Sequence, residues 1–167
     1  MKELHLLNTT EKIRDLFYSS KEDLVKVLEL AQKIRTMISI IDTFIQQHTS
    51  AVCPECRKVC CVNKHAHYGC DDLIYIQALG LEPHTYEQRA DHEPCQFLCK
   101  TGCRLDRTVR PSGCNWYFCD ALYDSMEKAP EMGYAQFDGS LQELADLWME
   151  LGAEFRRELK KIRGIEL

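Results

Sequence analysis

The sequence predicts a mainly α fold in which two long amphipathic helices bracket a cysteine-rich segment of short helices and irregular loops. Apolar residues recur every three or four positions near both ends of the chain. All ten cysteines lie between residues 53 and 119, and no stretch shows the alternating pattern typical of strands. We expect one domain over 1–167, with N-terminal helices in 1–50, the cysteine segment in 53–119 and C-terminal helices in 120–167.

The first long helix is predicted over residues 20–48, after a shorter one over about 9–18. Ser20 and Asp23 form a capping box at its expected start. One face is apolar throughout and is formed by Leu24, Val27, Leu28, Ala31, Ile34, Ile38, Ile41 and Ile45. A helix of this length, about 40 Å at 1.5 Å per residue, can serve as a spine or as a packing surface for a protein partner.

The second long helix is predicted to begin after Asp138-Gly139, where Ser140 and Glu143 form another capping box, and to end at Gly164. Its apolar face is formed by Leu141, Leu144, Leu147, Trp148, Leu151, Phe155, Leu159 and Ile162. The two apolar faces are expected to pack against each other. Between the long helices, short helices are predicted over 71–79, followed by Gly80, and over 116–128, closed by Pro130.

Composition limits the class of protein. Twenty-one Lys and Arg against 26 Asp and Glu give a net charge of −5, so nucleic acid is an unlikely partner. There is no secretory signal and no run of about 18 apolar residues, so a cytoplasmic protein without a membrane partner is expected. In a reducing cytosol, dense cysteines bind metal more often than they form disulfides. Five disulfides are the alternative in an oxidising compartment.

The cysteine spacing is typical of metal ligands. Cys53 and Cys56 form a CxxC turn, which directs two thiolates at one ion. Cys60 and Cys61 are adjacent, and neighbouring side chains tend to diverge, so this pair suits two metals or two irons of one cluster. The sequence therefore predicts a metal-binding segment with a polynuclear or paired site.

The motif Cys53-x-x-Cys56-x-x-x-Cys60-Cys61, with Cys95, Gly102-Cys103 and Arg110-Pro111-x-x-Cys114, resembles the YkgJ-type "CxxCxxCC" cysteine-cluster family. That family is described as a putative zinc- or iron-chelating domain. This chain has three residues before the cysteine pair where the family usually has two. The resemblance implies metal ligation by Cys53, Cys56, Cys60, Cys61, Cys95, Cys103 and Cys114, and Cys119 would complete eight thiolates. Cys70 and Cys99 fall outside the pattern. They could be buried free thiols, a redox pair, or ligands in place of some of the eight.

Other side chains offer weaker candidates. His65 and His67 could supply imidazole ligands, although surface or hydrogen-bonding roles are more common. His84 and His92, near Glu87, Asp91 and Glu93, could form a carboxylate–histidine site or only a polar loop. Cys70 and His67 are the one pair that could form a cysteine nucleophile and its base.

Charged and aromatic residues flank the cysteines. The cations near them are Arg57, Lys58, Lys64, Lys100, Arg104, Arg107 and Arg110. They could offset the thiolate charge and tune a redox potential, or form a solvated basic face. The aromatic run Trp116-Tyr117-Phe118 could stack nucleic-acid bases but more commonly would shield a metal site from water.

These observations predict a metal-binding protein that holds an iron–sulfur cluster or zinc, in electron transfer, redox sensing or as an accessory module. Both metals accept an all-cysteine site, and the crowded pair slightly favours iron. A zinc-stabilised protein-interaction module is one alternative. A metal-dependent enzyme is the other, because the resembled family includes cluster-containing protein methylases, although no S-adenosylmethionine site is recognisable.

Overall fold

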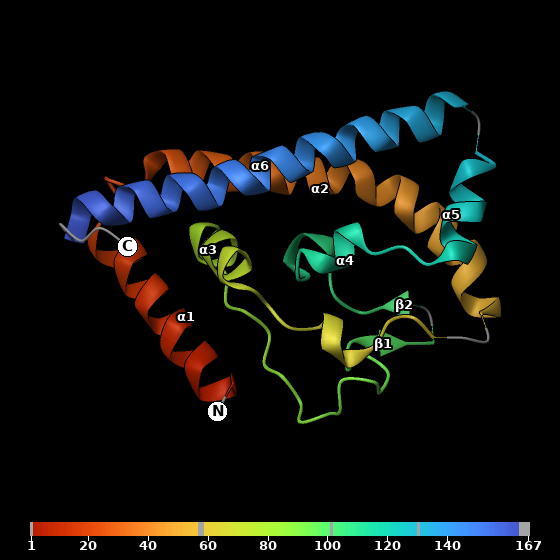
Figure 1. Ribbon diagram of the computed structural model, residues 1–167, viewed down its shortest axis with the longest axis horizontal. Coiled ribbons are helices and arrows are strands. Elements are labelled where there is room, and N and C mark those ends of the chain that lie inside the picture. The colour runs from red at the N-terminus through yellow and green to blue at the C-terminus, as the bar shows by residue number, and fades with distance from the viewer. Residues whose placement is uncertain (1, 57–58, 101, 130, 164–167) are drawn as a thin grey trace. The chain divides into compact units, whose positions relative to one another are not determined.

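The computed structural model describes residues 2–56, 59–100, 102–129 and 131–163, and helices dominate it (Figure 1). The α-helices are α1 (Lys2–Ser19), α2 (Val25–Val52), α3 (Cys70–Ala78), α4 (Gly113–Trp116), α5 (Asp120–Glu127) and α6 (Glu131–Arg163). Short 3₁₀ turns cover Cys53–Glu55, Asn63–His65 and Arg107–Val109, and a two-stranded antiparallel sheet joins β1 (Leu98–Cys99) to β2 (Gly102–Cys103). The predicted mainly α fold, with two long helices flanking a region of short helices, is confirmed.

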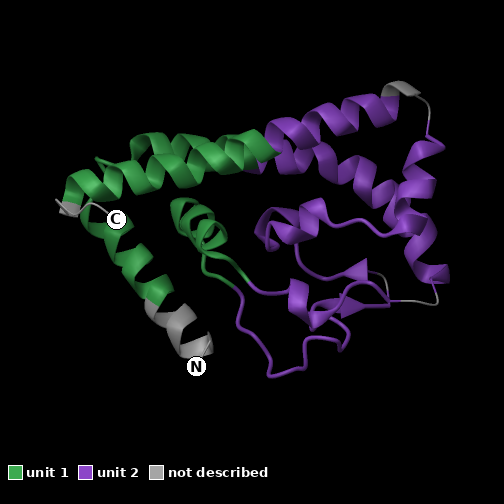
Figure 2. Ribbon diagram, viewed as in Figure 1, with its two compact units in different colours: residues 1–34, 68–83, 145–167 green, residues 35–67, 84–144 purple. Residues whose placement is uncertain are grey.

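The chain divides into two compact units, each built from segments distant in sequence (Figure 2). Unit 1 comprises residues 1–34, 68–83 and 145–167, and unit 2 comprises residues 35–67 and 84–144. Both long helices contribute to both units. The cysteine-rich stretch is therefore shared, because Cys70 belongs to unit 1 and the other nine cysteines belong to unit 2.

Unit 1 is held by the apolar faces of its helices. Phe17 of α1 stacks on Phe155 of α6 with ring centroids 5.9 Å apart, and Tyr75 of α3 lies 5.0 Å from the ring of Trp148. Lys26 of α2 forms ion pairs with Glu150 and Glu154 of α6 at 3.0 and 3.5 Å. The remaining core side chains of this unit are almost completely buried and include Leu24, Val27, Ile34, Leu73, Ile74, Ile76 and Leu151.

A buried carboxylate fixes the start of α3. The backbone N–H of Gly69 donates to Asp72 Oδ2 at 2.7 Å, and Asp72 is only 5% exposed. We expect Asp72→Ala to lower the free energy of unfolding by about 1–2 kcal/mol, because it leaves a helix-terminal donor without this acceptor. Asp71→Ala is the matched control, since its ion pair with Arg156 joins two half-exposed side chains and contributes about 0–1 kcal/mol. Urea denaturation measures both, and equal losses would contradict this role of Asp72.

In unit 2, the remaining halves of the long helices pack on each other and on α5. Phe44 of α2 stacks on Phe137 of α6 at 4.6 Å between ring centroids. His48 of α2 shares a 2.9 Å hydrogen bond between Nδ1 and Ser125 Oγ of α5. Ile38, Ile41 and Ile45 are buried on the same face of α2. Within unit 2, the two long helices are therefore in apolar contact through Phe44 and Phe137.

The predicted starts of both long helices are wrong. The first long helix begins at Val25, because residues 20–24 form a turn in which Ser20 N–H still bonds to Leu16 and Leu24 N–H bonds to Lys21. The second begins at Glu131, so Asp138-Gly139 and Ser140 lie inside it. The packing of Phe137 against Phe44 favours helix there more strongly than the turn-forming pair opposes it.

The predicted helix over 116–128 is divided in two. α4 ends at Trp116 and α5 begins at Asp120, with extended backbone at Tyr117 and Cys119 between them. The prediction for residues 71–79 is confirmed by α3 to within one residue at each end, and Gly80 follows it with a φ of +69°. The predicted stop signals Pro130 and Gly164 lie outside the described residues.

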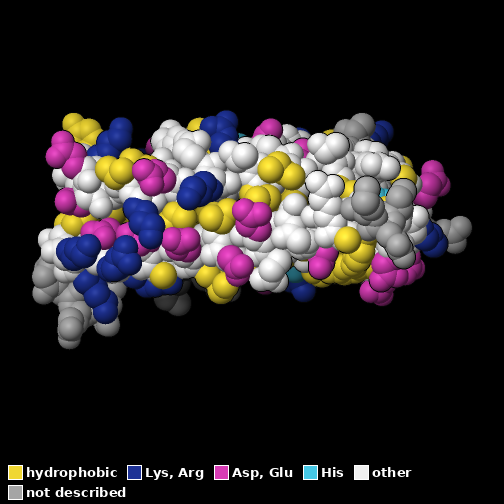
Figure 3. All heavy atoms as spheres, turned by 90° about the horizontal axis from the view of Figure 1, so that it is seen from above, with side chains coloured by type: hydrophobic (Ala, Val, Ile, Leu, Met, Phe, Trp, Pro, Cys, Tyr) yellow, Lys and Arg dark blue, Asp and Glu magenta, His cyan; other side chains and the backbone are white. Residues whose placement is uncertain are grey.

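The surface carries mixed charge. On the face shown in Figure 3, Lys and Arg side chains alternate with Asp and Glu, and hydrophobic side chains lie scattered among them. Val25, Ile40 and Met149 are more than half exposed, but single exposed apolar residues are common on soluble surfaces. Within the described ranges, no helix has both the length and the apolar composition that crossing a bilayer requires.

Candidate metal centre

All ten cysteines are free thiols in the structure. Unit 2 contains the eight that were predicted as metal ligands, together with Cys99. The backbone of this unit brings them near one another from four separate segments: the end of α2 with the loop after it, the loop before β1, the β1–β2 hairpin, and the residues around α4.

The adjacent pair is joined to the hairpin region by the backbone. Val62 forms an isolated antiparallel bridge with Pro94, and Cys95 N–H donates to the carbonyl of Cys61 at 2.9 Å. Cys103 follows in the hairpin, where it pairs with Leu98. The bridge therefore sets Cys61 beside Cys95, although 33 residues separate them along the chain.

A small apolar cluster supports this group of thiols. Its buried members are Ala66, Phe97 and Leu105, and Cys95 and Cys103 pack against it. Cys114 reaches the same region, because its thiol donates to the carbonyl of His65, the residue before Ala66, at 3.9 Å. Gly102 lies in the hairpin beside the cluster. Its φ of +109° is a backbone conformation that residues with a side chain adopt only with strain.

Backbone donors are directed at one of the sulfurs. The N–H groups of Phe97 and Leu98 hydrogen-bond to Cys95, and both bonds lower its pKa, while burial, the largest cause, raises it. Backbone N–H donors to sulfur favour the thiolate form, which is the form that binds a metal. The pKa of Cys95 is nevertheless raised overall, because burial outweighs these two donors.

The remaining predicted ligands gather at the end of α2. Cys53 opens the 3₁₀ turn Cys53–Glu55, and Cys56 N–H closes it by bonding to the carbonyl of Cys53 at 3.2 Å. The thiol of Cys60 is hydrogen-bonded to that of Cys119, the residue that caps α5. The charges of Cys60, Cys119 and Cys56 all act on Cys53.

Burial keeps the thiols of Cys60, Cys61 and Cys114 protonated at neutral pH, because it raises their pKa values. Burial raises the pKa of Cys60 to about 12 and that of Cys61 to about 11, and neighbouring thiols add to both shifts. Cys61 is exposed, yet the partial loss of hydration of its thiol is still the largest cause of its raised pKa. Burial likewise raises the pKa of Cys114 to about 11, and the charges of Cys103 and Cys95 contribute.

The thiols are neighbours but do not form a finished coordination sphere. Among the described residues, which include all ten cysteines, no three His, Cys, Asp or Glu side chains are arranged so that they could hold a metal ion. Binding of an ion would therefore require the sulfurs to move together and to lose their protons.

Several of the expected cations lie near the thiols. Arg107 is buried, with Nε bonded to Asp42 at 2.5 Å and Nη1 directed at the carbonyl of Cys114 at 3.4 Å. The charges of Arg107 and Arg110 both oppose the rise in the pKa of Cys114. Arg57 and Lys58 lie outside the described residues.

Sequence reasoning missed two charged residues of this site. Burial raises the pKa of Cys95, and the charge of Arg89 opposes part of this rise, but nothing in the sequence pattern connects these two residues, which are six positions apart. Asp42 lies on α2 and holds Arg107 across 65 positions of sequence. The one sequence signal for a role of Asp42 is that it is a charged residue within an otherwise apolar stretch of the helix.

Cys70 belongs to unit 1, whereas Cys99 belongs to unit 2 with the eight predicted ligands. Cys70 begins α3 in unit 1, where Asp71, Asp72 and Arg156 act on it in addition to its burial. Cys99 is exposed, and its thiol donates to the carbonyl of Gly102 within the hairpin at 3.0 Å. The candidate nucleophile and base, Cys70 and His67, belong to different units.

The histidines make aromatic contacts. His65 stacks on Tyr117 with centroids 4.9 Å apart, and His67 lies 4.7 Å from the ring of Tyr86. His84 packs near Phe97, at 5.7 Å. His92 is exposed. These contacts are those of surface and packing histidines.

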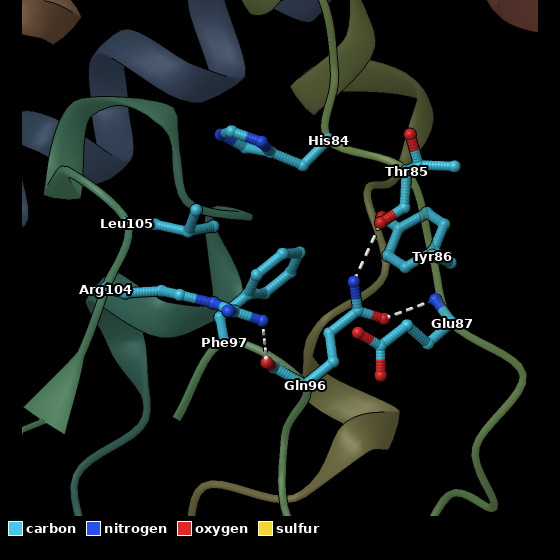
Figure 4. Close-up of a pocket in the computed structure, with 8 residues that line it drawn as sticks. All are labelled: His84, Thr85, Tyr86, Glu87, Gln96, Phe97, Arg104 and Leu105. Atoms are coloured by element: carbon cyan, nitrogen blue, oxygen red, sulfur yellow. Dashed lines mark hydrogen bonds between the residues drawn. The ribbon is translucent and has the colours of Figure 1, made fainter. Parts of the chain in front are cut away.

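A cavity of about 530 Å³ opens in unit 2 next to the apolar cluster (Figure 4). The amide of buried Gln96 shapes it, donating to the carbonyl of Thr85 and accepting from the N–H of Glu87, both at 2.7 Å. Arg104 Nη2 donates to the carbonyl of Gln96 at 2.5 Å. The other lining residues are His84, Tyr86, Phe97 and Leu105.

Comparison of this chain with protein-family models, with curated proteins and with solved structures finds no match.

Proposed function

We propose that this chain is a metal-binding protein in which Cys53, Cys56, Cys60, Cys61, Cys95, Cys103, Cys114 and Cys119 hold an iron–sulfur cluster or zinc. One observation supports the proposal: all eight predicted ligands belong to one unit, and among them Cys53, Cys60, Cys61 and Cys114 interact electrostatically with other thiols of the eight. Bound metal would supply either structural cross-linking or one-electron chemistry. The likeness to the cysteine-cluster family is part of this proposal.

The protein's own residues would prepare such a site. Arg107 and Arg110 place positive charge near Cys114, and backbone N–H groups face Cys95. A four-thiolate zinc site carries a formal charge of −2, so nearby cations and N–H donors lower the cost of burying it. Electron transfer, redox sensing or an accessory role in the cytoplasm would follow from an iron site, and a protein-interaction role from zinc.

Anaerobic purification, elemental analysis and a visible spectrum test the proposal. We expect stoichiometric iron with acid-labile sulfide and absorption near about 400 nm, or else stoichiometric zinc without colour. Iron would support the redox role, and zinc would support the structural one. A chain that contains neither metal and whose mass is lower by ten hydrogens would establish disulfides instead and refute the proposal.

A metal-dependent enzyme is the second candidate, because of the cavity. Tyr86, Phe97 and Leu105 line the cavity and also belong to the apolar cluster and its surround, against which Cys95 and Cys103 pack. Catalytic zinc sites keep one coordination position open beside a pocket. Azide added to the cobalt-substituted protein should change its visible spectrum if a position is open, and should leave it unchanged if all ligands are cysteines.

A further inference from the structure

The cavity of unit 2 has a largely apolar lining with one cationic side chain. In Figure 4, Arg104 and Leu105 extend into it from one wall and His84 extends from the facing wall. The ring of buried Phe97 lies 5.7 Å from that of His84. The volume of about 530 Å³ lies in the range of roughly 300–1,000 Å³ that is usual for pockets enclosing small organic molecules. The cavity therefore has the size and the lining of a small-molecule site.

Arg104 is held in place at both of its ends. Its backbone N–H donates to the carbonyl of Phe97 at 2.9 Å, and its Nη2 donates to the carbonyl of Gln96 at 2.5 Å. Gln96 is only 4% exposed, and its side chain is itself bonded at 2.7 Å to Thr85 and to Glu87. A group that is already positioned loses less conformational freedom when it binds a ligand. The guanidinium of Arg104 is thus preorganised beside the cavity.

Arg104 keeps hydrogen-bond donors that no described residue engages. A guanidinium has five N–H groups, and the side chain of Arg104 makes one bond, to Gln96. No carboxylate in the described part of the chain forms an ion pair with it. Glu87, the carboxylate among the lining residues, is already paired, because its Oε2 accepts from Nε and Nη2 of Arg89 at 2.7 and 2.6 Å. The positive charge of Arg104 is therefore available to an anion.

We propose that this cavity binds a small organic carboxylate that carries an apolar ring or chain. The carboxylate accepts hydrogen bonds from Arg104, and the apolar part contacts His84, Phe97 and Leu105. A planar guanidinium matches a carboxylate, because two parallel N–H groups can donate to its two oxygens. Phosphate groups are commonly held by several backbone N–H groups or cations, whereas Arg104 is the one Lys or Arg among the lining residues. The inference goes beyond the proposed function, because this site requires no metal.

Isothermal titration calorimetry of the full chain with matched probes tests the requirement for charge. Phenylacetate has the proposed chemistry, and phenylacetamide has nearly the same shape without the charge. We expect the carboxylate to bind about tenfold more tightly or better, because a hydrogen bond to a charged group contributes more than one to a neutral group. Equal dissociation constants, or no binding of either probe, would overturn the proposal. Tighter binding of phenyl phosphate than of phenylacetate would overturn the choice of a carboxylate.

Substitution of the cation locates the site. Arg104→Gln should abolish the preference for phenylacetate over phenylacetamide, with helix content unchanged by circular dichroism. Lys100→Gln is the matched control, because Lys100 is an exposed cation in the turn between β1 and β2 and does not line the cavity. It removes the same charge and should keep the preference. Equal loss of the preference in both variants would mean a general attraction of anions to unit 2 and would overturn the assignment to Arg104.

A second variant keeps the test decisive if Arg104→Gln does not fold. His84→Ala removes an exposed aromatic ring from the lining and leaves Arg104 in place. It should weaken the binding of phenylacetate and of phenylacetamide by the same factor, about twofold to tenfold, so that their ratio stays unchanged. Unchanged affinity for both probes would place their binding outside this cavity and refute the proposal.

Discussion

Removal of the proposed metal is expected to unfold the cysteine-bearing loops of unit 2 while the helices of unit 1 stay folded. Structural zinc binding contributes on the order of 10–16 kcal/mol, as much as or more than the 5–15 kcal/mol that stabilises a typical domain. In the described part of the loops around the bridge and the β1–β2 hairpin, the buried apolar cluster has only three members, Ala66, Phe97 and Leu105. Unit 1, in contrast, has a core of tightly packed helices.

Hydrogen exchange measured by mass spectrometry, before and after anaerobic treatment with a chelator, checks this expectation. Peptides covering residues 53–67 and 84–119 should lose their protection, and peptides from α3 and from residues 145–163 should keep it. Unchanged exchange in the loops after complete metal removal would mean that the apolar cluster and backbone bonds suffice to hold them.

Arg107→Met is expected to lower the free energy of unfolding by about 2–3 kcal/mol. Breaking a fully buried ion pair by removing one partner costs about 3–5 kcal/mol. The cost is smaller here because Asp42 is 41% exposed and can be hydrated once Arg107 is gone. The loss includes the bonds to the carbonyl of Cys114 and to Asn115, both at 3.4 Å, which hold the loop that carries a predicted ligand.

Asp42→Asn is the matched control, because an amide oxygen can still accept from Arg107 without the charge. It should cost clearly less in urea denaturation than Arg107→Met. Metal content and chelator resistance, measured on both variants, separate a role at the metal from a role in packing. If Arg107→Met leaves both stability and metal retention unchanged, the buried guanidinium does not support the Cys114 loop.

The sequence predicted the long helices because their signal is local. Apolar residues at spacings of three and four appear along both, and burial of Ile34, Ile38 and Ile41 confirms the inward face. Helix starts were predicted less well, because a capping-box sequence is compatible with a helix start but does not require one. Ser140 lies inside α6 and does not start it. The preceding turn is held as helix because Phe137 stacks on Phe44 of α2.

For the candidate site, the sequence identified the residue types but not their grouping. The spacing within Cys53–Cys61 is visible along the chain, and the eight predicted ligands all belong to unit 2. The bridge between Val62 and Pro94 is a long-range contact without a local signal, so the pairing of Cys61 with Cys95 could not be predicted. The same holds for Asp42, whose contact with Arg107 depends on how the loop folds back on α2.

The discontinuous make-up of unit 1 has a consequence for how the protein is made. A nascent chain acquires its last cysteine at residue 119, whereas the stacking of Phe17 on Phe155 must wait for most of α6 to be synthesised. Contacts between residues so distant in sequence slow folding, because a long loop must close before they form. All ten thiols are therefore present on the growing polypeptide before unit 1 can close, so the proposed metal could bind before this last step of folding.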